Sequence, residues 1–139
     1  MADTTNQIRV RLVTPERTLF ESTADAIELP SQAGYMEVLR GHAPLLAELA
    51  AGDVTLHGGP CDGQTINVSW GFVEVLPDRV TILASDALKP EEIDVARAEK
   101  QLDRGFQMWK EAGDRADAYK EALRVISEAE AKIASAEKR

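Results

Sequence analysis

The first part of the chain alternates apolar and polar residues with a period of two. In IRVRLV, Ile8, Val10 and Leu12 fall on one face, whereas Arg9 and Arg11 fall on the other. Such alternation is typical of a strand with one buried face, because successive side chains of a strand point to opposite sides of the sheet. The segment TINVSWGFVEVL alternates in the same way. Both segments are therefore predicted to be strands that cover a core.

Turn-forming residues separate these two segments from several shorter apolar ones. Glycine and proline recur about every eight to twelve residues, which is the spacing of an all-β sandwich or barrel. No intervening stretch is long enough for the helical crossover that joins parallel strands, so the sheet is expected to be antiparallel. The predicted strands are 8–13, 18–20, 25–29, 36–39, 53–57, 65–76 and 80–85, with loops at 31–34 and around 57–64.

The motif RGHAPLL lies between two of these predicted strands. Gly41 and Pro44 are expected to shape a bend, because glycine permits unusual backbone angles and proline fixes one of them. The leucines that follow are expected to anchor this bend in the core, at Leu45, Leu46 and Leu49.

After residue 88 the period changes to that of amphipathic helices. Pro90 fits the first position of a helix, and the acidic residues after it complement the positive end of the helix dipole. Gly113 is expected to end this helix and Asp114 to cap a second one. The predicted apolar stripes are Val95, Ala98, Leu102, Phe106 and Trp109, then Tyr119, Ala122, Leu123, Ile126, Ala129, Ile133 and Ala136.

These patterns predict an α+β fold in two parts. An antiparallel β-sandwich occupies residues 1–88, and an antiparallel two-helix hairpin occupies residues 89–139. The density of charge changes at the same place, with 22 charged residues among 91–139 against 18 in the 90 residues before. The second stripe is largely alanine, and apolar burial contributes only about 25 cal/mol per Å², so the hairpin is expected to be the less stable part. One interpretation is that it docks on the sandwich or leaves it for a partner; the other, which the sequence alone favours, is a static, packed two-helix appendage.

The composition argues against several classes of function. A net charge of −8 disfavours non-specific binding to nucleic acids or anionic lipids, which requires a basic surface. No apolar run approaches the roughly 18 residues of a membrane-spanning helix, and the first ten residues lack the apolar core of a signal peptide. The single cysteine, Cys61, suits a reducing compartment. A cytoplasmic protein is therefore expected.

The candidate chemistry centres on one histidine. His42 has the side chain of a general base, but no nucleophile motif such as G-x-S-x-G accompanies it. His42 and His57 lack the spacing of a metal site, and the chain has no phosphate-binding P-loop. A structural or interface role for His42 is favoured over a small enzyme that uses it. The residues alone thus predict a binding or structural component.

Basic residues are spread along the predicted hairpin. One interpretation is a solvated face whose ion pairs, Glu111–Arg115 and Glu128–Lys132, lie four residues apart. The other is a surface that binds an acidic partner. The pattern of residues leaves both interpretations open.

The chain resembles the epsilon subunits of F-type ATP synthases through three segments in this order: LPSQAGYMEVLRGHAPLLAELAAGDVTL, SWGFVEVLPDRVTILASDA and EEIDVARAEKQL. Together they extend the resemblance over nearly the whole chain. The most specific features are the GHAPLL box, GFVEV followed by VTIL, and the ID-x-x-RA start of the helical part. The resemblance implies a ten-stranded flattened sandwich followed by two helices.

This resemblance implies a rotor component with no catalytic residues, resident cofactor or metal. Such subunits dock on the gamma subunit and the c-ring through the sandwich, and they link proton flow to ATP synthesis. Their helical hairpin reaches the beta and alpha subunits of the catalytic head and inhibits ATP hydrolysis. The implied location is peripheral, on the cytoplasmic face of the bacterial plasma membrane, with no nucleic acid and with membrane contact only through the complex. The alternative is a stand-alone β-sandwich interaction module without a synthase role.

The resemblance also implies candidate site residues. Those for the gamma and c-ring interface are Gln32, Ala33, Gly34, Tyr35, Arg40, Gly41, His42 and Pro44. Those for inhibitory contacts of the hairpin are the basic residues Arg115, Lys120 and Arg124. Asp94 and Arg97 occupy positions at which some relatives bind ATP, although Leu88 replaces an acidic residue of that site.

The chain departs from the family pattern at further positions. Glu37 and Arg40 stand where glycine and proline are usual, and Tyr35 stands where an acidic residue is common. Trp70 stands where relatives often have a second glycine next to Gly71. These differences are expected to alter the loop near the c-ring and one strand.

Overall fold

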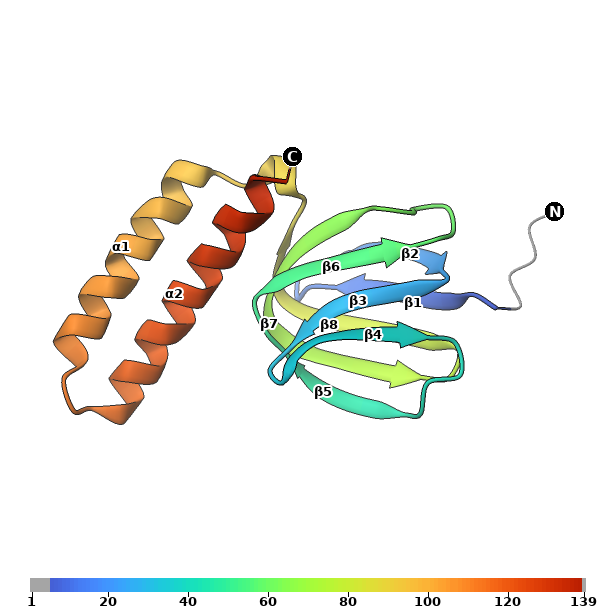
Figure 1. Ribbon diagram of the computed structural model, residues 1–139, viewed down its shortest axis with the longest axis horizontal. Helices are drawn as coiled ribbons and strands as arrows, with labels where there is room; N and C mark the ends of the chain where they lie inside the picture. Colours follow the sequence, from blue (N-terminus) through green and yellow to red (C-terminus); the bar gives the residue numbers. More distant parts are fainter. Residues whose placement is uncertain (1–5, 139) are drawn as a thin grey trace. The chain divides into compact units, whose positions relative to one another are not determined.

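The computed structural model describes residues 6–138, which form two compact units divided between Ala87 and Leu88 (Figure 1). The first unit contains β1 (Ile8–Val13), β2 (Thr18–Ala24), β3 (Ala26–Ser31), β4 (Gly34–Leu39), β5 (Leu45–Leu49), β6 (Gly52–His57), β7 (Thr65–Leu76) and β8 (Arg79–Leu88), apart from the last residue of β8, which falls in the second unit. The second contains a short 3-10 helix (Pro90–Glu92), α1 (Val95–Ala112) and α2 (Ala116–Ala136). The predicted fold, a β-sandwich followed by two helices, is confirmed.

The sandwich is built around β7, which belongs to both layers. The first part of β7, residues 65–68, pairs with β6, and the second part, residues 71–75, pairs with β5. One layer continues from β7 through β8 and β1 to β2, and the other continues from β6 through β3 to β4. β7 thus joins the two layers through β6, and β5 links them again, because it pairs with β7 and, at Leu49, with Ser31 of β3.

One pair of strands is parallel, against the expectation of a wholly antiparallel sheet. β1 and β8 run in the same direction, with Arg9 opposite Arg79 and Val13 opposite Leu83. The expectation failed because a parallel pair needs a long connection but not necessarily a helix. Here the six intervening strands of the sandwich make that connection.

β7 remains one strand of twelve residues although it changes partner at its middle. At this point Trp70 has a positive φ of 50°, and Gly71 follows with φ 138°. A β-carbon on Gly71 would collide with the carbonyl oxygen of Leu83 on β8, so only glycine fits this close approach. The resemblance implied ten strands, whereas residues 6–138 contain eight, because long strands such as β7 serve both layers.

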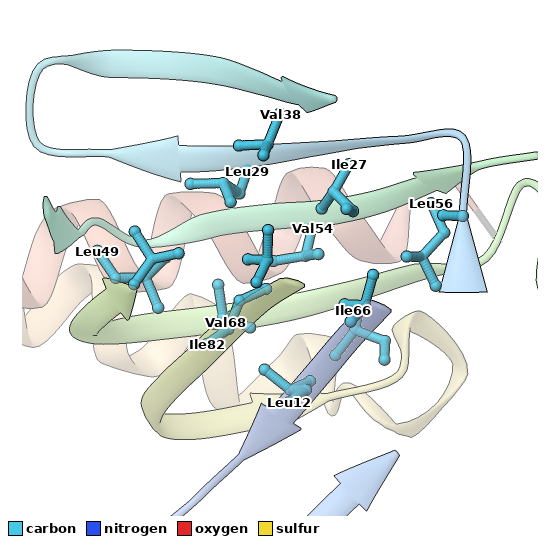
Figure 2. Close-up of a cluster of buried hydrophobic side chains, with 14 of the residues drawn as sticks. Leu12, Ile27, Leu29, Val38, Leu49, Val54, Leu56, Ile66, Val68 and Ile82 are labelled. Atoms are coloured by element: carbon cyan, nitrogen blue, oxygen red, sulfur yellow. The ribbon is translucent and has the colours of Figure 1, made fainter. Parts of the chain in front are cut away.

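Apolar side chains from both layers meet in one core. Figure 2 shows Leu29 and Val38 on one side of this cluster and Leu12 on the other, all completely or almost completely buried. The alternation that predicted β1 is confirmed, because Ile8 and Val10 are buried with Leu12 while Arg9 and Arg11 are exposed.

The segment after Pro44 forms β5, a strand that the sequence pattern had not predicted. Leu49 is buried as expected, but Leu45 is 39% exposed and Leu46 is 69% exposed. The expectation that all three leucines anchor the core was wrong, because the pairing of β5 with β7 places Leu46 opposite the exposed Glu74. Leu46 therefore lies on the outer face of the sandwich.

The helices of the second unit pack through small residues spaced seven apart. These small buried residues are Ala98, Gly105 and Ala112 in α1, and Ala122, Ala129 and Ala136 in α2, where Val125, Ile126 and Ser135 are buried beside them. A β-carbon on Gly105 would lie 2.7 Å from Cγ1 of Ile126, so the two helix backbones approach closely at this level.

Four large residues of the predicted stripes do not lie in this interface. Their exposed fractions range from 41% to 45%, and they are Phe106, Trp109, Tyr119 and Leu123. The predicted stripe was too wide because the small side chains set the line of closest approach, and the larger residues flank it.

The helix ends also differ from the prediction. Pro90 begins the 3-10 helix, not α1, because the chain is extended again at Ile93 and Asp94. Asp94 then caps α1. At α2 the N-cap position is taken by Arg115 rather than by Asp114.

Candidate interaction surfaces

The interface candidates of the sandwich lie at opposite ends of β4. Residues 32–35 form the β3–β4 turn and the start of β4, whereas residues 40–44 connect β4 to β5. β4 has six residues, and at about 3.3 Å per residue it separates the two groups by roughly 20 Å. The candidates therefore form two sites.

The first site is a tight turn in place of the predicted four-residue loop. Ser31 and Gly34 pair as the last residues of β3 and β4, and Ser31 Oγ donates a hydrogen bond of 2.6 Å to the carbonyl oxygen of Gly34. Only Gln32 and Ala33 remain in the turn, and both are exposed together with Gly34 and Tyr35. The short turn leaves the site little conformational freedom.

The second site is the β4–β5 connection. Gly41 has a φ of 89°, which suits glycine, and its N–H donates to the carbonyl oxygen of Pro77 at 2.7 Å. Arg40 Nη1 donates to the carbonyl oxygen of Gln7 at 3.1 Å. His42 is half-buried, and its Nδ1 lies 2.7 Å from the carbonyl oxygen of Ala43. These contacts hold the loop against the β7–β8 turn and the start of β1.

A third surface, the outer patch, consists of Leu46, Phe72 and Leu83. These residues project from the neighbouring strands β5, β7 and β8 and are 69%, 49% and 46% exposed. Sequence analysis missed this patch because it assigned Leu46 to the core. The available signal was the alternation within LLAEL, in which Leu46 and Glu48 share the face opposite to Leu49.

The basic candidates of the hairpin have different surroundings. Arg115 donates from Nη2 to the carbonyl oxygen of Glu111 at 2.8 Å and from Nε to that of Ala112 at 3.3 Å, so it caps the end of α1. The predicted ion pair of Arg115 with the Glu111 carboxylate is replaced by these bonds, since that carboxylate accepts from Gln107 instead. The other predicted pair is confirmed, with 3.1 Å between Lys132 Nζ and Glu128 Oε1.

Lys120 and Arg124 lie on exposed positions of α2. The guanidinium of Arg115, in contrast, donates hydrogen bonds to backbone carbonyl oxygens at the end of α1. Of the three basic candidates, Lys120 is the one whose replacement disturbs the described contacts least.

Asp94 and Arg97, the ATP-site candidates, are joined by a contact of the fold. Asp94 Oδ1 accepts a hydrogen bond of 3.1 Å from the backbone N–H of Arg97. This contact is the N-cap of α1. Capping the helix is a sufficient reason for an aspartate at position 94, and no bound ligand is needed to explain it.

His42 and Ser85 both make side-chain contacts to backbone carbonyl oxygens. Ser85 Oγ donates to the carbonyl oxygen of Ser69 at 2.6 Å, and His42 contacts its own neighbour. No cluster of three or more His, Cys, Asp and Glu side chains suited to a metal ion occurs in the described part of the chain. Likewise, none of its helices combines the length and apolarity needed to cross a membrane.

Two solved structures share the fold. A chain in the mitochondrial ATP synthase of Euglena gracilis, in an assembly of OSCP, F1 and c-ring, aligns with a TM-score of 0.78 and 21% identity, covering 99% of this chain and 85% of that one. A chain in the central stalk and c-ring of the Tetrahymena thermophila enzyme aligns with a TM-score of 0.68 and 15% identity, covering 93% and 96%. At these identities the likeness shows the fold alone.

Curated relatives are closer in sequence. The ATP synthase epsilon chain of Koribacter versatilis is 43% identical over 115 residues, covering 81% of this chain and 77% of the relative. That of Solibacter usitatus is 38% identical over 132 residues, covering 95% and 97%. The family model for the β-sandwich domain of the ATP synthase delta/epsilon chain matches residues 7–90. The chain therefore belongs to the family of ATP synthase epsilon chains.

Proposed function

We propose that this chain is a non-catalytic rotor subunit of an F-type ATP synthase. Its sandwich docks on the gamma subunit and the c-ring and links proton flow to ATP synthesis. The chain lies at the cytoplasmic face of a bacterial plasma membrane and meets the membrane only through the complex. Membership of the epsilon-chain family supports this proposal, as does the fold shared with a chain of an assembly that contains F1 and a c-ring.

The outer patch is the observation that carries the proposed gamma interface. Leu46, Phe72 and Leu83 expose large apolar side chains on adjacent strands. A cluster of exposed apolar residues beside charged ones is typical of a protein interaction surface. We assign this patch to gamma, together with the β4–β5 connection that contains Arg40, Gly41, His42 and Pro44.

We assign the opposite end of β4 to the c-ring. Gln32, Ala33, Gly34 and Tyr35 are exposed on a short turn that is braced from several sides. A braced turn suits a contact that transmits torque, because little entropy is lost when it binds. Tyrosine stands at position 35 where the family pattern implies a carboxylate, so contact with the ring here uses an aromatic face, because the hydroxyl already accepts from the Asp53 N–H.

We further propose that the hairpin inhibits ATP hydrolysis by contacting acidic surface on the beta subunit. Its helices pack mainly through alanine and glycine, which bury little apolar area. A weakly packed element can exchange between two dockings that differ by little free energy. We assign the contact to the exposed residues Lys120 and Arg124, whereas Arg115 mainly caps α1.

The gamma interface is tested by pull-down of the full-length chain with the gamma subunit of the same complex. Leu46→Glu and Phe72→Asp are expected to reduce gamma binding at least tenfold without loss of the folded sandwich, because both side chains are exposed. Leu123→Glu is the matched control, since Leu123 is exposed to a similar degree but lies on α2. Undiminished gamma binding by both patch variants would place the interface elsewhere.

The inhibitory role is tested in the reassembled complex by ATP hydrolysis rates. Lys120→Glu is expected to raise hydrolysis, because it reverses a charge facing acidic surface, and Lys110→Glu on α1 serves as the control. If the two variants hydrolyse ATP at the rate of the native complex, the hairpin does not inhibit through this residue.

A stand-alone interaction module without a synthase role predicts a different result. In that case the chain would not co-purify with gamma and the catalytic subunits. Co-purification from cells at native expression level distinguishes the two functions directly.

A further inference from the structure

An open groove of about 490 Å³ lies on the outer face of the sandwich where β1 and β8 run side by side. Its lining includes three arginines, Arg9, Arg11 and Arg79, on a chain whose net charge is −8. Glu21 and Glu74 also line it, so the groove is mixed in charge but rich in guanidinium groups. Such a concentration of arginine in an acidic protein calls for an explanation.

The parallel pairing of β1 with β8 is what gathers these arginines. Arg9 lies opposite Arg79, and Arg11 lies opposite Thr81. All of them alternate with buried residues, so they project to the same outer face. Like charges directly opposite each other on neighbouring strands repel, and an anion between them relieves that repulsion.

The acidic neighbours equal the arginines in number, with Glu21 and Glu74 in the lining and Asp78 beside Arg9, but the ion pairs that they form are exposed. Arg11 Nε is 3.2 Å from Glu21 Oε1, and Arg9 Nη2 is 3.5 Å from Asp78 Oδ2, with all four side chains more than half exposed. Ion pairs that are this exposed contribute little and exchange readily. Within residues 6–138 the structure shows no ion-pair partner for Arg79.

The groove is continuous with the outer patch. Val13 and Leu83 are the second registered pair beyond Arg11 and Thr81 on β1 and β8, and the first on the same face. A protein that covers Leu83 and Phe72 therefore reaches the groove after about two residues along the strands, roughly 7 Å. The partner of the patch and the occupant of the groove are then parts of the same molecule.

We propose that the groove binds an acidic segment of the protein that covers the outer patch. A carboxylate of that segment sits between Arg9 and Arg79, where two guanidinium groups offer paired donors. This inference rests on the proposed gamma interface and adds the chemistry of its partner: an apolar surface flanked by aspartate or glutamate. The charged groove mainly speeds association and makes the association rate depend on salt, whereas the apolar outer patch slows dissociation of the complex.

The test measures association of the full-length chain with the purified gamma subunit at several salt concentrations. The double variant Arg9→Glu/Arg79→Glu is expected to slow association at least tenfold at low salt and to flatten its salt dependence. Arg17→Glu is the control, because it reverses one charge, half the change of the double variant, on an exposed residue of the β1–β2 loop. It is expected to change the rate by less than threefold.

The outcomes separate this inference from the one it rests on. If the native chain does not bind gamma, the proposed function fails. If the native chain binds and the double variant binds at the same rate with the same salt dependence, the groove is not an acidic-segment site although gamma docking stands. A third outcome would make the groove a lipid site and overturn the inference. In that outcome the native chain binds phosphatidylglycerol vesicles and the double variant does not, while both associate with gamma at the same rate.

Discussion

Tyr35 Oη accepts a hydrogen bond of 3.0 Å from the backbone N–H of Asp53, and this contact ties the β3–β4 turn to the start of β6. The contact requires glycine at position 52, where a β-carbon would lie 2.5 Å from the tyrosine oxygen. Tyr35, which departs from the family pattern, thus braces the β3–β4 turn, at the end of β4 that is assigned to the c-ring.

Removing this hydroxyl should destabilise the sandwich. Tyr35→Phe leaves the Asp53 N–H without this acceptor, and Asp53 is only 5% exposed, so we expect a loss of about 1 kcal/mol in the free energy of unfolding. The measurement is urea denaturation followed by circular dichroism. Tyr119→Phe, at the 42% exposed tyrosine of α2, should leave stability unchanged. Equal stability of the two variants would show that the Tyr35 contact contributes nothing.

The backbone at Trp70 should prefer glycine to alanine. Glycine within a strand normally costs stability relative to alanine, but a φ of 50° is unfavourable for any residue with a β-carbon. We therefore expect Trp70→Gly to be more stable than Trp70→Ala by about 1 kcal/mol. Both variants lose the indole, so the difference between their unfolding free energies reports the cost of the backbone conformation at position 70. Greater stability of the alanine variant would contradict the positive φ.

The close approach of α1 and α2 should make Gly105 intolerant of a methyl group. Intrinsic helix propensity favours alanine over glycine by about 1 kcal/mol. The added β-carbon would nevertheless lie 2.7 Å from Ile126 Cγ1 and 3.2 Å from the Ile126 backbone nitrogen, which forces the helices apart.

We expect Gly105→Ala to lower amide hydrogen-exchange protection in both helices of the full-length chain. Ser127→Ala, at an exposed position of α2, should preserve or raise that protection. Higher protection in Gly105→Ala than in the native chain would mean that the helices are not packed this closely.

The cap of α1 separates a structural from a ligand-binding role of Asp94. Asp94→Ala removes the acceptor of the Arg97 N–H and should cost about 1 kcal/mol of local stability, whereas Asp94→Ser should retain most of it. The measurement is hydrogen exchange of the first turn of α1, with and without ATP. If ATP protects that turn in the native chain and protection is lost in Asp94→Ser, then Asp94 binds nucleotide in addition to capping the helix.

Local patterns were sufficient to predict many of the elements. The strand at 65–76 begins and ends as predicted, because alternation, a glycine-rich loop before it and Pro77 after it all act over short distances. The alternation of β1 assigned its buried and exposed faces correctly for the same reason. The partners assigned to the two loops followed only from family motifs, since nothing in the spacing of the loop residues indicates a partner.

Periodicity along the chain was enough to assign the class of most elements, with β5 and the 3-10 helix as exceptions, and, where alternation is strict, which of their faces is apolar. The tertiary structure decided what lies opposite each face. It placed Leu46 outside the core, paired Arg9 with Arg79 across a parallel register and set Gly105 at the closest point between the helices. The physical reason is that periodicity depends on neighbours in the chain, whereas register and burial depend on contacts between segments far apart in sequence.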